Sequence, residues 1–177
     1  GRILLKSTKN TTLDAGSQTT ASGATGGEVR IESGDTTLVS GTIAAKGSAG
    51  TGGTVQVLGN QVGLIETANI DASGETGGGT VLVGGDYQGR NPEVQNAYRA
   101  YVGPEATIRA DAIAQGDGGK VVVWADGDTR YAGSISARGA GSGDGGMVEV
   151  SGKQLLDFHG RIDVGAENGR GGRVLLD

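Results

Sequence analysis

The chain repeats one short hydrophobic pattern at nearly regular intervals. Two and four residues after certain glycines both positions are aliphatic, while the residue between them varies. Seven such pairs occur: Ile3/Leu5, Val29/Ile31, Val55/Val57, Val81/Val83, Val121/Val123, Val148/Val150 and Val174/Leu176. The glycines that precede them are residues 1, 27, 53, 79, 119, 146 and 172, so the intervals are 26, 26, 26, 40, 27 and 26 residues. Alternation with a period of two predicts a half-buried β-strand in every repeat.

A second motif follows each glycine by about 16 residues. It places an isoleucine and a small apolar residue on either side of a variable position: Ile43-x-Ala45, Ile70-x-Ala72, Ile108-x-Ala110, Ile135-x-Ala137 and Ile162-x-Val164, with Thr19-x-Ala21 as a weaker copy. Between the two motifs lies a less regular apolar spot: Leu38-Val39, Leu64-Ile65, Tyr131 and Phe158. We therefore expect two or three short strands per repeat, each with alternate residues facing inward.

A repeat of this size is too small to bury a hydrophobic face alone, so successive repeats must stack. Stacking at ~4.8 Å would align Val29, Val55, Val81, Val121 and Val148 in one buried column, in a rod of about 30 Å. The sequence thus predicts an all-β parallel β-helix (β-solenoid) of about seven coils, spanning 1–177 as one segment. An antiparallel sandwich would need Asn-Gly or Asp-Gly turns every 8–12 residues, and Asp126-Gly127 is the one clear case. The repeated glycines are expected at sharp turns, which often need positive φ.

Composition narrows the function classes. The 177 residues include 37 Gly, no Cys and 35% hydrophobic residues, and the net charge is −5. Without a run of Lys or Arg the chain is a poor candidate for binding nucleic acid or anionic membranes, and no apolar run approaches the ~20 residues that span a bilayer. Because the chain starts without Met and ends in mid-pattern, we expect it to be a fragment of a longer protein, with open strand edges that favour end-to-end association.

Several runs resemble the shaft of filamentous-haemagglutinin-type adhesins, which are exported by two-partner secretion and include biofilm-matrix adhesins. The runs are 118–127 (GGKVVVWADG), 129–139 (TRYAGSISARG) and 143–153 (GDGGMVEVSGK), with 84–89 (GGDYQG) and 172–177 (GRVLLD). The resemblance is close over residues 78–177. It implies a right-handed β-helix, an outer-membrane secretion partner, a secreted or bacterial cell-surface location, and a role in cell adhesion, matrix attachment or virulence. The family's Asn-Pro-Asn-Gly export sequence is absent, which favours an internal shaft segment.

The 40-residue interval predicts an excursion of about 14 residues from the coil, which we assign to about 84–105. This stretch holds both prolines and three of the four tyrosines, and concentrates polar and aromatic side chains as a recognition surface does. The expected ligand-binding residues are Tyr87, Asn96, Tyr98, Arg99 and Tyr101, together with Trp124. Polysaccharide or a host or matrix surface is the expected partner. The alternative is a structural flap, with Tyr101-Val102 as the middle strand of that coil.

Trp124 joins this set by its position. It stands five residues after Gly119, and the same offset on the preceding coil is Gly84, where the excursion starts. Because Val121 and Val123 are expected to face in, the indole should face outward. An exposed Trp beside tyrosines could stack sugar rings. The same arrangement could instead be a hydrophobic patch that seals the excursion to the shaft.

Residues for catalysis are few, and we expect no enzyme and no cofactor. The single His, His159, is expected to face solvent, and no Gly-x-Ser-x-Gly motif occurs. Asp71 and Asp163 would lie three coils apart, about 14 Å, which is too far for glycoside hydrolysis. Asp86, Asp126 and Asp128 are weak candidates for a Ca²⁺ site or for acid/base work, against the simpler interpretation of solvated turn aspartates. A polysaccharide-active β-helix enzyme and the stalk of a contact-dependent toxin are the alternative functions.

Overall fold

Short parallel strands form three sheets that run the length of the molecule. The computed structural model describes residues 1–177. Sheet A contains seven strands, in the order β1 (Arg2–Ser7), β4 (Glu28–Ser33), β7 (Thr54–Leu58), β10 (Thr80–Val83), β13 (Lys120–Ala125), β16 (Met147–Gly152) and β19 (Arg173–Leu176). Each of the other sheets contains six strands, so the chain makes six complete coils and begins the next.

The two six-stranded sheets have the same coil order as sheet A. Sheet B contains β2 (Thr11–Leu13), β5 (Thr36–Val39), β8 (Gln61–Leu64), β11 (Arg99–Val102), β14 (Asp128–Tyr131) and β17 (Leu155–Phe158). Sheet C contains β3 (Gln18–Thr20), β6 (Thr42–Ala44), β9 (Asn69–Asp71), β12 (Thr107–Arg109), β15 (Ser134–Ser136) and β18 (Arg161–Asp163). Every strand pairs only with its equivalents on neighbouring coils.

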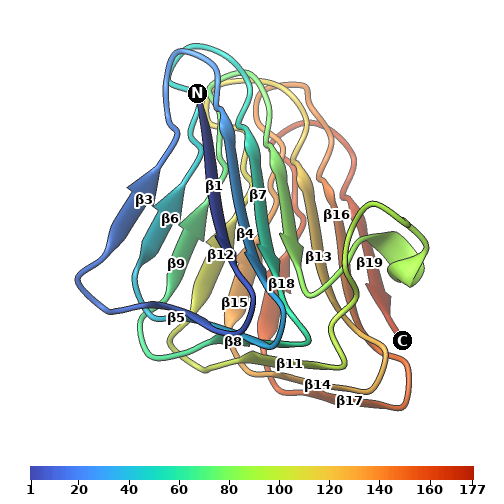
Figure 1. Ribbon diagram of the computed structural model, residues 1–177. Helices are drawn as coiled ribbons and strands as arrows, with labels where there is room; N and C mark the ends of the chain where they lie inside the picture. Colours follow the sequence, from blue (N-terminus) through green and yellow to red (C-terminus); the bar gives the residue numbers. More distant parts are fainter.

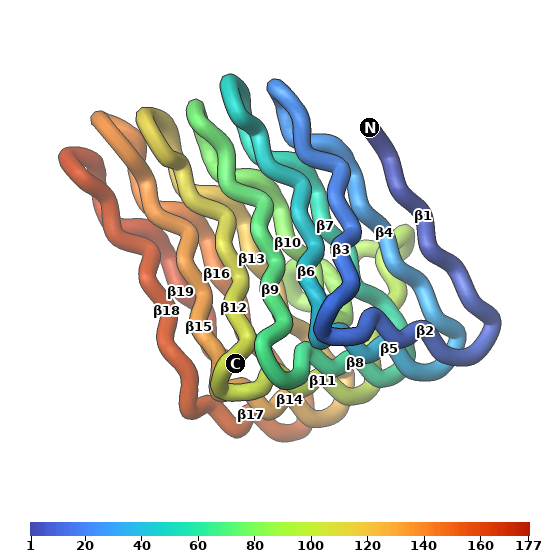
Figure 2. The backbone as a smooth tube through the Cα atoms, turned by 90° about the vertical axis from the view of Figure 1, so that its left-hand side faces the viewer, coloured from blue at the N-terminus to red at the C-terminus, as the bar shows by residue number.

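The coil is right-handed. From the N-terminal end, which is nearest the viewer in Figure 1, the chain descends along β1, runs leftward along β2, climbs β3 and crosses the top to β4. This clockwise path recedes from the viewer, and Figure 2 shows the coils from the side in strict sequence order, from blue to red. The predicted right-handed β-solenoid is therefore confirmed.

Aliphatic side chains fill the narrow interior. Val29, Val55, Val81, Val121 and Val148 are consecutive partners in the sheet A ladder and are fully buried, which confirms the predicted column. The largest core cluster contains 29 buried residues, nearly all of them aliphatic or alanine. Its one aromatic member, Tyr131, stacks on Phe158 with ring centroids 5.3 Å apart. Stacking of identical positions thus produces one continuous core.

The glycine pairs allow close contact between coils, not unusual backbone angles. The second glycine of these pairs does not have a positive φ in any of these coils: Gly27, Gly53, Gly79, Gly119 and Gly146. A Cβ on Gly119 would instead clash with the carbonyl oxygen of Gly79 on the preceding coil. The expectation of positive φ at these positions was wrong, because the constraint is the space between backbones.

Helical structure is limited to one 3₁₀ turn, η1 (Tyr87–Gly89), in the excursion. No helix is long and apolar enough to cross a membrane.

Candidate functional site

The excursion is a flap of residues 85–96, which leaves and rejoins the coil at one point. The backbone N–H of Ala97 donates to the carbonyl of Gly84 at 2.7 Å, so the chain returns to the position from which it left. Gly84 and Gly85 have φ of 75° and 155°, values that side-chain-bearing residues rarely adopt. In Figure 1 the flap is the yellow-green loop that projects from the outer face of sheet A.

The predicted excursion, 84–105, was too long. Residues Arg99–Val102 form β11, which pairs in parallel with β8 on one side and β14 on the other. The alternative interpretation of Tyr101-Val102 as the middle strand is therefore correct. As a result the expected recognition residues divide into two groups: Tyr87 and Asn96 belong to the flap, whereas Tyr98, Arg99 and Tyr101 lie on or beside sheet B.

Trp124 faces outward from the core, but the flap covers it. Only 6% of its surface is exposed, so the prediction of an exposed indole was wrong. A Cβ on Gly85 would lie 2.8 Å from Cδ1 of the indole, and a Cβ on Gly89 would lie 2.6 Å from Cε2. The flap backbone therefore lies directly against the ring, which its glycines allow. The indole Nε1 donates to Oδ1 of Asp126 at 3.0 Å, so in this conformation Trp124 seals the flap and offers no face to a sugar.

Apolar contacts attach the flap to the outer face of sheet A. Val94 of the flap packs with Trp124 and with three aliphatic side chains of successive coils, Leu58, Leu82 and Val122, in a buried cluster separate from the main core. These outward positions would otherwise expose a hydrophobic patch to water. Burying a side chain of this size contributes about 1.5–3 kcal/mol, so the patch holds the flap closed.

Buried polar contacts add to this attachment. Glu149 of β16 is fully buried under the flap, where its Oε2 accepts the backbone N–H of Gln88 at 2.9 Å and its Oε1 accepts the Ser151 hydroxyl at 2.9 Å. Gln88 has a φ of 53°, in the left-handed region that side-chain-bearing residues rarely adopt. A buried carboxylate without such donors would be strongly destabilising.

Asp86 attaches the base of the flap to sheet A. Its carboxylate forms an ion pair with Nζ of Lys120 at 2.5 Å and accepts Nδ2 of Asn91 at 2.8 Å and the backbone N–H of Tyr87 at 2.7 Å. Burial alone would raise the pKa of Asp86, but these three donors outweigh it, so the pKa lies below its ordinary value. Asp86 is therefore ionised at neutral pH, and its carboxylate is held by these three donors within the protein.

The three aspartates proposed as a weak metal or acid/base cluster do not assemble. No group of three or more acidic, His or Cys side chains could hold a metal ion. The flap separates Asp86 from Asp126. The backbone N–H of Asp126 donates to the carbonyl of Ala97, where the chain rejoins the coil. Its side-chain Oδ1 accepts hydrogen bonds from Nε1 of Trp124 and Nδ2 of Asn96. Equal sequence offsets on adjacent coils were misleading here because the flap intervenes between them.

The other candidate catalytic residues lie apart from one another. Asp71 forms an ion pair with Lys46 at 3.7 Å, and Asp163 forms one with Arg138 at 2.6 Å. Two strands separate the two aspartates in sheet C, where they occupy equivalent positions. His159 is exposed, and its Nε2 lies 2.8 Å from Asp157.

Tyr98, Arg99 and Tyr101 remain accessible. Tyr98 and Tyr101 are 46% and 44% exposed, and the guanidinium carbon of Arg99 lies 5.9 Å from the centroid of the Tyr98 ring. Tyr101 is the aligned neighbour of Gly63 on β8 and of Arg130 on β14. Sequence analysis did not single out Gly63 or Arg130, whose link to Tyr101 lies in the alignment of neighbouring coils.

Taken together, these features define a right-handed parallel β-solenoid with a continuous aliphatic core and a single sealed flap. Among solved structures, the chain is similar to the HMW1 secretion domain from Haemophilus influenzae, with a TM-score of 0.64 and 25% sequence identity. The match covers 98% of this chain and 49% of that one, so this chain spans about half the length of its structural neighbour. No family model and no curated protein sequence matches the chain.

Proposed function

We propose that this chain is a shaft segment of a secreted bacterial surface adhesin of the two-partner secretion class. The observation that carries the proposal is the likeness to the HMW1 secretion domain along almost the entire chain. The shaft-like repeats of the second half agree with it. In this role the segment extends the protein away from the cell surface, and an outer-membrane partner exports the parent protein.

The architecture suits a shaft because each coil contacts only its neighbours and adds a fixed length of about 4.8 Å. Stiffness comes from three ladders of parallel backbone hydrogen bonds and from the stacked core. The outer faces carry alternating charges, such as Lys46 beside Asp71 and Arg138 beside Asp163. Such a surface keeps the sides of the rod solvated while leaving room for local binding sites.

We further propose that the segment contributes to cell adhesion or biofilm-matrix attachment, and that it binds polysaccharide without cleaving it. Beads coated with the chain should attach to matrix-producing cells better than beads coated with Val121→Asp, which places a charge in the buried column and should not fold. Equal attachment of the two would contradict an adhesive role.

Incubation of the chain with acidic and neutral polysaccharides should release no reducing ends. Release of reducing ends that is abolished by Asp126→Ala would instead support an enzyme.

Export is tested separately. The chain, joined to the export domain of a two-partner system and produced with its outer-membrane partner, should reach the medium as a protease-resistant fragment. Retention inside the cell, while the export domain alone is released, would argue against the secreted class. The two experiments are independent, because adhesion is measured on purified protein.

A further inference from the structure

A groove crosses the outer face of sheet B, away from the flap. It has a volume of about 400 Å³, within the ~300–1,000 Å³ of small-ligand pockets. Four strands of consecutive coils line it: β5, β8, β11 and β14. The side chains that line it include Leu38, Gln61, Ile65, Tyr101, Asp128 and Arg130, with Arg99 beside them.

The groove exists because one coil lacks an outward side chain. The aligned outward positions of these four strands are Leu38, Gly63, Tyr101 and Arg130. Gly63 therefore leaves a gap between Leu38 and Tyr101, and Leu38 leans into it, since a Cβ on Gly63 would lie 2.8 Å from Cδ2 of Leu38. Gly63 does not have a positive φ, so its backbone conformation does not require glycine.

The walls of the groove combine an aromatic face with unpaired cations. The ring of Tyr101 is 44% exposed at one side, and Leu38 and Ile65 supply apolar surface. Arg99 and Arg130 take part in none of the seven ion pairs of the chain. Both guanidinium groups line the same groove, where Asp128 is the single acidic residue. They offer paired donors that match a carboxylate.

The backbone excludes one common kind of occupant. An extended peptide binds a sheet by pairing with an unpaired edge, but both neighbours of β8 and of β11 are occupied by other coils. Recognition in the groove must therefore use side chains alone. An aromatic ring suits the apolar face of a sugar, and Gln61 and Asp128 can accept hydrogen bonds from hydroxyl groups.

We infer that this groove binds an acidic oligosaccharide, with a sugar ring over Gly63 against Tyr101 and a uronic-acid carboxylate held by Arg99 and Arg130. This deepens the proposed adhesive function by naming a ligand class and its place on the shaft. Because guanidinium groups supply the charge recognition, binding weakens as ionic strength rises.

Titration calorimetry of the full chain with a short polyuronate tests this inference. The same oligosaccharide with its carboxyl groups reduced to alcohols should bind at least tenfold more weakly. Gly63→Thr fills the groove on the solvent side and should weaken polyuronate binding at least tenfold at an unchanged melting temperature. Arg130→Gln, an exposed change that leaves the core intact, should do the same. Arg109→Gln is the matched control, since Arg109 belongs to the same coil as Arg99 but to sheet C.

Three results would overturn the inference. The first is that the reduced oligosaccharide binds as well as the polyuronate. The second is that Arg109→Gln weakens binding as much as Arg130→Gln. The third is that poly-glutamate binds as tightly as the polyuronate and loses affinity in Gly63→Thr. The last result would assign the groove to acidic peptides. Wild-type beads that attach to matrix, with Gly63→Thr beads attaching equally well, would reject the groove and leave the adhesive shaft standing. Wild-type beads that attach to nothing would reject the adhesive function itself.

Discussion

Each coil is so thin that single side chains span a large part of its interior. Val121 lies between Val81 and Val148 in the buried column, and all three are fully inaccessible to water. A core of this shape has few neighbours that can shift to fill a void. Residues in the column and in the glycine pairs should therefore be sensitive to changes of one or two methyl groups.

Val121→Ala should lower the free energy of unfolding by about 1–3 kcal/mol, because it removes buried aliphatic volume and leaves a cavity. Urea denaturation measures the effect. A loss of only a few tenths of a kcal/mol would mean that the position is not packed as described.

Gly119→Ala should be more damaging than its single added methyl group suggests. The new Cβ would meet the carbonyl of Gly79, and the two coils would have to separate at the point where their hydrogen bonds begin. We expect a loss of at least about 2 kcal/mol, in the upper part of the overpacking range. Gly16→Ala is the matched control, since nothing lies within 4 Å of a Cβ there, and thermal melting should leave it close to the original protein.

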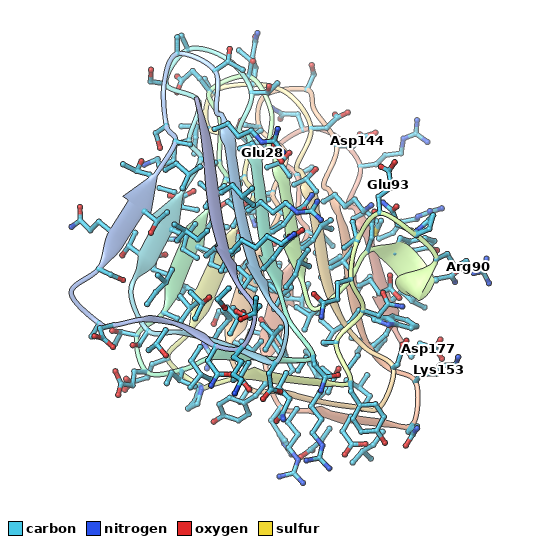
Figure 3. The ribbon with its side chains drawn as sticks, viewed as in Figure 1. Glu28, Arg90, Glu93, Asp144, Lys153 and Asp177 are labelled. Atoms are coloured by element: carbon cyan, nitrogen blue, oxygen red, sulfur yellow. The ribbon has the colours of Figure 1, made fainter.

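At the scale of the element, the flap is an insertion with its own small core. Its contacts with Trp124, Glu149 and Lys120 lie outside the solenoid, so it can open while the coils stay intact. Local opening of this kind is governed by the few contacts that open with it. In Figure 3 Arg90 points from the outer side of the flap into solvent, away from those contacts.

Trp124→Ala should release the flap selectively. Removing a buried Trp side chain costs about 3 kcal/mol or more, so hydrogen exchange of the flap amides should accelerate roughly a hundredfold. The amides of β7 and β10 should keep their protection. Tyr98→Ala, which removes an exposed ring, serves as the control, and equal flap protection in the two variants would show that the indole does not hold the flap.

Acid should open the flap through Asp86. Because the folded-state pKa of Asp86 is lowered, its contribution to stability is present above its unfolded pKa of about 3.9 and is lost as the pH falls through the folded value. Trp124 is the single tryptophan of the chain, so its fluorescence should shift to the red as it becomes hydrated below about pH 4. Asp86→Asn should remove much of this pH dependence. An identical transition in both proteins would assign it to other carboxylates.

At the scale of the molecule, the sequence predicts the solenoid well because one constraint recurs in every coil. The valines of sheet A keep a constant offset from the coil glycine, so their column follows from counting. The middle strands do not keep it: Leu38 stands 11 residues after Gly27, but Gly63 stands 10 after Gly53. A shift of one residue conceals the alignment of Leu38, Gly63 and Tyr101, and with it the groove.

The flap shows a second limit of prediction. The 40-residue interval reveals that extra chain is present, but the point of return depends on the hydrogen bond between Ala97 and Gly84. No local pattern marks that bond. For the same reason, strand alternation predicts that Trp124 faces outward, whereas its burial depends on a loop whose path does not follow from the spacing of residues in the sequence.

The extra residues of the flap coil also change how the rod would lengthen under tension. If the ends are pulled apart, the terminal coils should detach one after another, since each is held only by its neighbour. A detached coil of 26 residues releases about 90 Å of contour length, at ~3.4 Å per extended residue. The 40-residue coil releases about 140 Å. Single-molecule stretching should therefore record a series of equal steps with one longer step, and that step should shorten to match the others when residues 85–96 are deleted.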